Sequence, residues 1–186
     1  MLIYGVIASS YPAVSGAFES IATATGTGSS DTITFTSIPS TYKHLQIRAL
    51  AKNSDGADTA LGNFTIVLNS DTGSNYARHY VRGDGSTATA DGRATQTSMQ
   101  SAQSVAGGGS TSIYGVSIID IHDYANTSKY KTIRYFDGVD LNGSGRVGLG
   151  SGLWMNTAAV SSISLRVNFA NWNTGTTIAL YGIKGA

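Results

Sequence analysis

The fold is decided by the stretch Phe18-Glu-Ser-Ile-Ala-Thr-Ala-Thr25, Gly26-Thr-Gly-Ser-Ser30 and Asp31-Thr-Ile-Thr-Phe-Thr-Ser-Ile-Pro-Ser-Thr-Tyr-Lys-His-Leu-Gln-Ile-Arg48. Apolar side chains such as Ile33 and Phe35 alternate with threonines, which is the pattern of a strand with one buried face. The Gly/Ser run and the Pro/Ser run interrupt this alternation and are typical of turns. The stretch therefore predicts three β-strands joined by two turns, almost without charge.

The same alternation recurs along the rest of the chain. It predicts further strands over residues 63–69, 75–82, 112–121, 129–136, 146–155, 161–169 and 175–184. Strong helix formers other than Ala and Leu are scarce, whereas β-branched residues and Tyr are plentiful. A chain of 186 residues suits one domain. We therefore predict an all-β fold, a single β-sandwich of jelly-roll type.

The N-terminal segment differs from the rest because it carries no charged side chain. We predict an extended arm over residues 1–16 and a β-sandwich domain over residues 17–186, with a long polar excursion at 83–109. The arm lacks the basic start of a signal peptide and is too short to span a bilayer. Its apolar side chains suit docking into a groove or along a sheet edge of a partner. They are Leu2, Ile3, Tyr4, Val6, Ile7 and Tyr11.

Composition narrows the possible partners and chemistry. Charged residues make up 12% of the chain, about half of the usual share. With 41% hydrophobic residues in regular alternation, this low charge predicts a folded protein whose surface is largely covered by copies or partners. The net charge of +1 offers no basic surface for nucleic acid. The absence of cysteine excludes disulfides and thiol chemistry.

The segment nearest to a metal or acid–base cluster is Asp120-Ile-His-Asp123. On a strand, Asp120 and His122 share one face, and a histidine with carboxylates suits a transition metal. Such a site needs at least one more ligand, and His44 and His79 are distant in the sequence. The competing interpretation, which we favour, is a polar strand end that enters a loop.

Catalytic carboxylate pairs are not apparent. A glycosidase needs two carboxylates held at a set distance across a cleft. The chain has one glutamate, Glu19, and its aspartates lie mostly in Gly/Ser/Asn-rich segments. The pairs Asp55/Asp58 and Asp137/Asp140 occur in turn contexts, where Asp is favoured for its hydrogen bonds to the backbone. We therefore expect neither an enzyme nor a cofactor.

The aromatic residues Trp154, Trp172, Tyr124 and Tyr130 are open to two interpretations. They could stack on a sugar, or they could anchor a core or a subunit interface, which is the commoner role in all-β domains. Segment 112–121 is apolar on both faces, which predicts cover by its own core and by a neighbouring subunit. The candidates for that subunit interface are Tyr114, Val116, Ile118, Trp154 and Trp172.

Two segments carry a resemblance to a known class of proteins. The run Phe18-Glu-Ser-Ile-Ala-Thr with Ile33-Thr-Phe-Thr-Ser-Ile-Pro-Ser-Thr-Tyr-Lys-His-Leu-Gln-Ile-Arg48 resembles the opening of small structural proteins of tailed bacteriophages, especially phages of cyanobacteria and aquatic bacteria. Ile178-Ala-Leu-Tyr-Gly-Ile-Lys184 resembles their usual ending. The resemblance implies a β-sandwich on the outer surface of a virion, assembled as a homotrimer. It implies either capsid decoration or a part of a fibre or tail appendage.

The uncharged arm favours capsid decoration. A decoration (cement) protein binds the outer shell and stabilises it by bridging capsomers. The expected partners are then the major capsid protein or neighbouring virion proteins, with neither nucleic acid nor membrane. The alternative is a tail or head fibre component that recognises a host surface glycan, through the 83–109 excursion and the Trp/Tyr set. A third class, a polysaccharide-degrading enzyme, would depend on Asp120 or His122.

Overall fold

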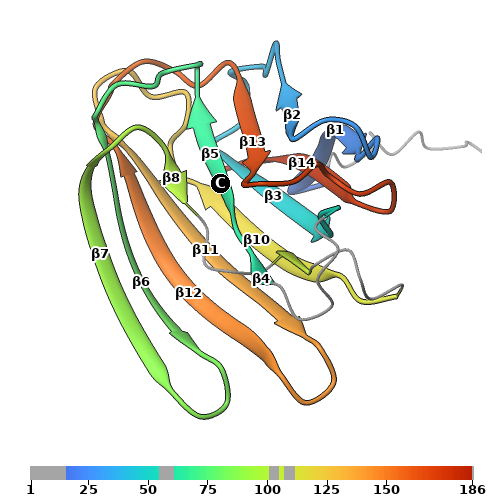
Figure 1. Cartoon of the computed structure of the whole chain (residues 1–186). Helices are drawn as coiled ribbons and strands as arrows, with labels where there is room; N and C mark the ends of the chain where they lie inside the picture. The colour runs from blue at the N-terminus through green and yellow to red at the C-terminus, as the bar shows by residue number, and fades with distance from the viewer. Residues whose placement is uncertain (1–15, 55–60, 101–104, 107–111, 186) are drawn as a thin grey trace, which may run out of the picture.

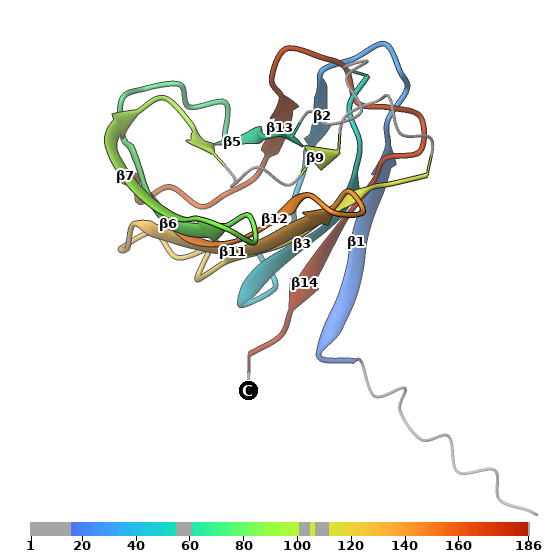
Figure 2. The same ribbon diagram turned by 60° about the horizontal axis from the view of Figure 1, so that its bottom comes forward.

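The computed structural model describes residues 16–54, 61–100, 105–106 and 112–185. This part of the chain contains fourteen strands and no helix, and hence no helix long and apolar enough to cross a membrane. Two antiparallel sheets pack against each other, as Figure 1 and Figure 2 show. The prediction of an all-β sandwich is confirmed.

The larger sheet has eight strands. In spatial order they are β1 (Phe18–Thr25), β14 (Thr177–Ile183), β3 (His44–Ala51), β10 (Gly115–Ile121), β11 (Lys131–Asp140), β12 (Gly145–Trp154), β6 (Tyr76–Gly83) and β7 (Ala88–Gln96). The smaller sheet has the order β2 (Thr32–Phe35), β13 (Ile163–Val167), β5 (Phe64–Leu68) and β8 (Met99–Gln100). A separate pair joins β4 (Leu61–Gly62) to β9 (Val105–Ala106).

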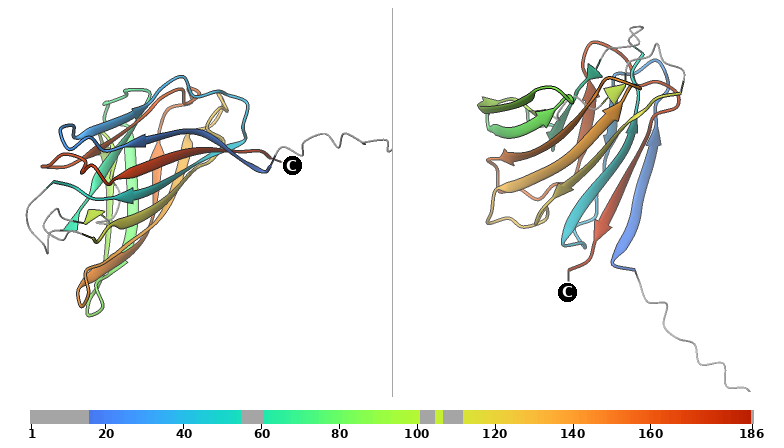
Figure 3. Two further views of the ribbon diagram at one scale, coloured as in Figure 1. Left: turned by 90° about the vertical axis from the view of Figure 1, so that its right-hand side faces the viewer. Right: turned by 90° about the horizontal axis from the view of Figure 1, so that it is seen from below.

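Successive strands mostly alternate between the two main sheets, from β1 to β2, β3 and β5. This alternation is what two packed Greek keys require. The runs β6–β7 and β10–β11–β12 depart from it, because all of their strands stay in the large sheet and widen it to eight strands (Figure 3). The jelly-roll type therefore stays a prediction.

The core lies between the two sheets and is built from the inward face of each strand. In the small sheet, Phe64, Ile66 and Leu68 of β5 are fully buried. Their counterparts in the large sheet include Ile47 and Ile119, which are also fully buried. Each such side chain contributes roughly 1.5–3 kcal/mol through its removal from water. The alternation of buried and exposed residues in the sequence therefore corresponds to the inner and outer faces of the sheets.

The buried and exposed faces of strand β12 are the reverse of what its composition suggests. Gly148, Gly150 and Gly152 face the core. The aliphatic residues Val147 and Leu149 face outward. A Cβ on Gly150 would lie 2.2 Å from Cζ of Tyr135, and one on Gly152 would lie 2.6 Å from the sulfur of Met99. The glycine face therefore makes room for a large ring and a thioether that reach across the core.

Two regions differ from their predicted structure. The polar excursion at 83–109 contains a regular strand, β7, which forms one edge of the large sheet and is exposed on both faces. It was missed because a strand without a buried face has no apolar alternation. Segment 137–145 was expected to be a loop, yet β11 runs on to Asp140, and Asp137 is buried within it.

Candidate functional site

The predicted docking arm cannot be placed. Its side chains Leu2, Ile3, Tyr4, Val6, Ile7 and Tyr11 lie outside the described residues. The described chain starts at Gly16, just before β1, and β1 forms the other edge of the large sheet.

The carboxylates of the candidate metal cluster, which the sequence pattern did not favour, are occupied by basic and amide side chains. Asp120 accepts a hydrogen bond from Gln46 at 2.8 Å and pairs with Arg134 at 2.9 Å. Asp123 lies between Lys43 at 2.8 Å and Lys129 at 3.0 Å. The hydrogen bonds from these two lysines hold the pKa of Asp123 well below its usual range. Both carboxylates are therefore stabilised as anions by protein cations.

The structure brings a second histidine to this place. The rings of His44 and His122 meet edge to face with their centroids 5.1 Å apart. Nδ1 of His44 accepts a hydrogen bond from the backbone N–H of Asp123 at 3.0 Å, and burial lowers the pKa of His44. Within the described residues, no group of three or more histidine and acidic side chains is arranged to hold a metal ion. The geometry favours the polar strand end over a metal site.

The two tryptophans are core residues, which corrects their assignment to a subunit interface. Both are buried within the chain itself. The indole N–H of Trp154 donates to Asp71 at 2.8 Å, and that of Trp172 donates to the carbonyl of Leu165 at 3.3 Å. A buried indole with a satisfied N–H has no surface left for a second subunit or a sugar. Tyr124 is likewise buried, so three of the four aromatic residues of the alternative sugar-stacking platform lie in the core.

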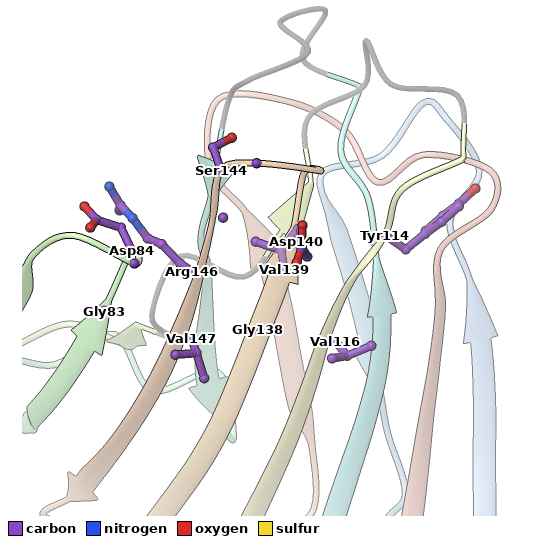
Figure 4. A pocket seen from close by; sticks show the side chains of 13 residues that line it. Gly83, Asp84, Tyr114, Val116, Gly138, Val139, Asp140, Ser144, Arg146 and Val147 are labelled. Atoms are coloured by element: carbon purple, nitrogen blue, oxygen red, sulfur yellow. The ribbon is translucent and has the colours of Figure 1, made fainter.

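A depression of about 590 Å³ lies at the tips of hairpins β6–β7 and β11–β12 (Figure 4). Asp84 and Arg146 stand on one side of it, and Tyr114, also an interface candidate, stands on the other. Asp84 accepts the backbone N–H groups of Ser86 and Thr87, which lowers its pKa to about 2. The acidic groups here serve the turns, as Asp140 does by accepting the N–H of Asn142 at 2.8 Å.

The largest unexplained feature is an exposed apolar surface on the outer face of the large sheet, which we call the apolar band. Its seven side chains lie on β3, β10, β11, β12 and β6, and each is 42–55% exposed. They are Leu50, Val81, Val116, Ile118, Phe136, Val147 and Leu149.

Strand register makes the apolar band continuous. One cross-strand row runs Ile118, Phe136, Leu149 and Val81, and the adjacent row runs Leu50, Val116, Gly138 and Val147. The next row toward the middle of the sheet is polar and runs Gln46, Asp120, Arg134, Ser151 and His79. A shallow groove of about 210 Å³ lies at one end of the band, where β6, β11 and β12 contribute four of the band's side chains to its lining. Soluble monomers rarely expose an apolar patch of this kind without a use for it.

Sequence reasoning found only part of the apolar band. Val116 and Ile118 were expected at an interface, and the structure places both on the exposed side of β10. Phe136, Val147 and Leu149 were missed, because an aliphatic or aromatic residue in an alternating strand is normally assigned to the core. The available signal was the alternation of Val147 and Leu149 with glycines, which leaves the inward face of β12 without side chains from residue 148 to 152.

No family model matches the chain, and neither does any curated protein sequence. Exo-inulinase from Aspergillus awamori shares 10% identity over 90% of this chain, with a TM-score of 0.35. A protein of unknown function from Shewanella oneidensis MR-1 shares 11% identity over 81% of this chain, with a TM-score of 0.22. The chain spans 29% of the inulinase and 62% of the second protein. Likenesses this low carry no argument about function.

Proposed function

We propose that this chain is a non-enzymatic structural protein of a bacteriophage virion that decorates the outer shell of the capsid. The observation that carries the proposal is the apolar band, a continuous surface suited to protein contact rather than to chemistry. The resemblance of the two chain ends to phage structural proteins supplies the virion setting. That resemblance also implies a homotrimer, which is an expectation separate from this proposal.

The mechanism is mechanical. The arm at residues 1–16 attaches to the major capsid protein or to a neighbouring virion protein, and the sandwich bridges adjacent capsomers. A contact of standard size, roughly 1,600 Å² in total, adds an interface that must be broken before the shell opens. Burial of much of the surface in such a lattice also accounts for a charged share of only 12%.

The fibre alternative has less support. It depended on aromatic side chains that would stack on a glycan, and three of the four, Trp154, Trp172 and Tyr124, are buried in the core. Only Tyr130 remains exposed. We therefore rank decoration first.

Binding to capsids tests the proposal. Purified protein is mixed with heads of the encoding phage from which this gene has been deleted, and co-sedimentation is measured. We expect saturable binding that raises the temperature at which heads release DNA. Binding to intact host cells or glycans but not to heads would overturn the decoration role in favour of the fibre.

Variants of the arm test the mode of attachment. We expect Ile3→Asp with Ile7→Asp, or removal of residues 1–16, to abolish co-sedimentation and leave thermal unfolding unchanged. The matched control is Ser9→Asp with Ser10→Asp, which adds the same charge at polar positions and is expected to bind normally. Normal decoration by the truncated chain would show that the arm is not the attachment site.

A further inference from the structure

We infer that the apolar band is the contact surface for a second copy of this chain, and that the two copies pair face to face about a two-fold axis. The inference concerns the isolated protein and does not rest on the virion role. Three observations support it. They are the size of the band, the fully hydrogen-bonded backbone of its central strands, and the opposite charges at the two ends of its face on β11.

The size of the apolar band matches one side of a protein interface. Seven half-exposed side chains leave on the order of 600 Å² of residue surface in water, at the upper end for the largest patch of a monomer. The polar row beside the band, which includes Arg134 and Ser151, extends this toward the roughly 800 Å² that each partner buries in a stable complex. A partner of ordinary size therefore covers the whole band.

The backbone under the apolar band restricts what can cover it. Strands β10, β11 and β12 are each hydrogen-bonded to a neighbour on both sides, so no free edge is present for an added strand. An extended peptide on this face, such as the N-terminal arm, would direct its own N–H and C=O groups against apolar side chains without partners. A second sheet has its backbone already paired and packs at about 10 Å through side chains alone.

The outer face of β11 is self-complementary in charge. It presents Arg134, Phe136, Gly138 and Asp140 in that order, with the apolar pair in the middle. Six residues of strand separate the cation from the anion by roughly 20 Å. A two-fold axis through the centre sets Phe136 of each copy against Gly138 of the other and brings Arg134 of each copy to Asp140 of the other. Isologous contacts have this reciprocal form.

The charges already present do not prevent such a pairing. Arg134 is 62% exposed on its side chain although it contacts Asp120, so its guanidinium still has free donors. Asp140 is exposed, and among the described residues it accepts one side-chain hydrogen bond, from the N–H of Asn142 to its Oδ1. A two-fold contact pairs copies, whereas a homotrimer would need a different surface.

Light scattering after size-exclusion chromatography tests the inference on the full chain. We expect a species of twice the 19.3 kDa of one chain. Phe136→Asp is expected to give the single-chain mass, with an unchanged circular-dichroism spectrum as the check on folding. The matched control is Phe169→Asp, the same change at a fully exposed position outside the band, which is expected to keep the double mass.

A charge exchange keeps the test decisive if Phe136→Asp disturbs folding. Asp140→Lys places two cations together at each border and is expected to weaken the pair at least tenfold. Addition of Arg134→Glu in the same chain restores opposite charges and is expected to recover the pairing. A monomeric wild type, an oligomer insensitive to both Phe136→Asp and Asp140→Lys, or a pair lost only on removal of residues 1–15 would overturn the inference.

Discussion

Replacement of Lys131 by methionine probes the most deeply buried charge among the described residues. Lys131 lies at the start of β11, opposite Trp154, and its side chain is fully enclosed. Its Nζ donates to three backbone carbonyls, those of Asn126 at 2.6 Å, Lys129 at 2.8 Å and Thr157 at 3.0 Å. All three ammonium hydrogens are thus satisfied although burial lowers the pKa of the group.

Methionine keeps the apolar stem and removes every donor. Each carbonyl that loses its partner costs about 1–3 kcal/mol. Part of the sum is offset, because an ammonium group no longer has to be held out of water. We therefore expect the free energy of unfolding to fall by about 3 kcal/mol, at the low end of that sum. In a chain of this size the midpoint of thermal unfolding then falls by about 6–12 °C.

Urea unfolding followed by tryptophan fluorescence measures this change, because Trp154 and Trp172 are both buried in the folded chain. Lys129→Met is the matched control. It removes a lysine two residues away whose side chain is 59% exposed and whose ion pair with Asp123 is screened by water, so a much smaller change is expected. A Lys131→Met variant within about 1 kcal/mol of the wild type would refute the argument from unpaired carbonyls.

Four further substitutions, one of them a control, test the packing and the pH dependence. Gly150→Ala places a Cβ 2.2 Å from Cζ of Tyr135, so urea titration is expected to show a loss of about 1–3 kcal/mol by overpacking. Gly138→Ala, whose Cβ meets nothing nearer than 3.5 Å, is expected to be neutral in the same titration. Hydrogen bonds from Asn75, Gly73 and Trp154 lower the pKa of Asp71 to about 2. That carboxylate therefore stabilises the fold above its unfolded pKa of about 3.9 and ceases to do so as the pH falls through about 2. Asp71→Asn is expected to flatten unfolding free energies across this acid range, and an unchanged acid dependence would contradict the assignment. Burial, and then the charge of His122, lowers the pKa of His44, so stability is expected to fall as the pH drops below about 6.5. His44→Asn keeps an acceptor for the N–H of Asp123 and should remove this fall in thermal melts, whereas a variant that melts like the wild type at every pH would refute it.

The strands were largely predictable because most of them have one buried face. β1 was predicted with its observed limits, Phe18–Thr25, and β13 was predicted to within two residues at each end. β7 was not, because it is exposed on both faces and its sequence is polar throughout. Two-residue strands such as β4 are too short to show any period.

The candidate sites were less predictable because they depend on contacts between distant segments. His44 meets His122 only because β3 and β10 are neighbours in the sheet, so the sequence distance between the two histidines was misleading. Trp154 and Trp172 are large and apolar enough for either a core or an interface. Their burial is settled by the neighbours that enclose them and by acceptors placed for their N–H groups.

Local residue pattern and composition are enough to establish the all-β class, the periodic strands and the low charge. The face of each strand that lies inside is set by contacts between distant strands, which local pattern does not contain. In β12 the bulk of Tyr135 and Met99 fills the core opposite the glycines, and Val147 and Leu149 therefore point to the surface. A period of two specifies that the faces differ, but which face is buried depends on the volume that distant strands bring to it.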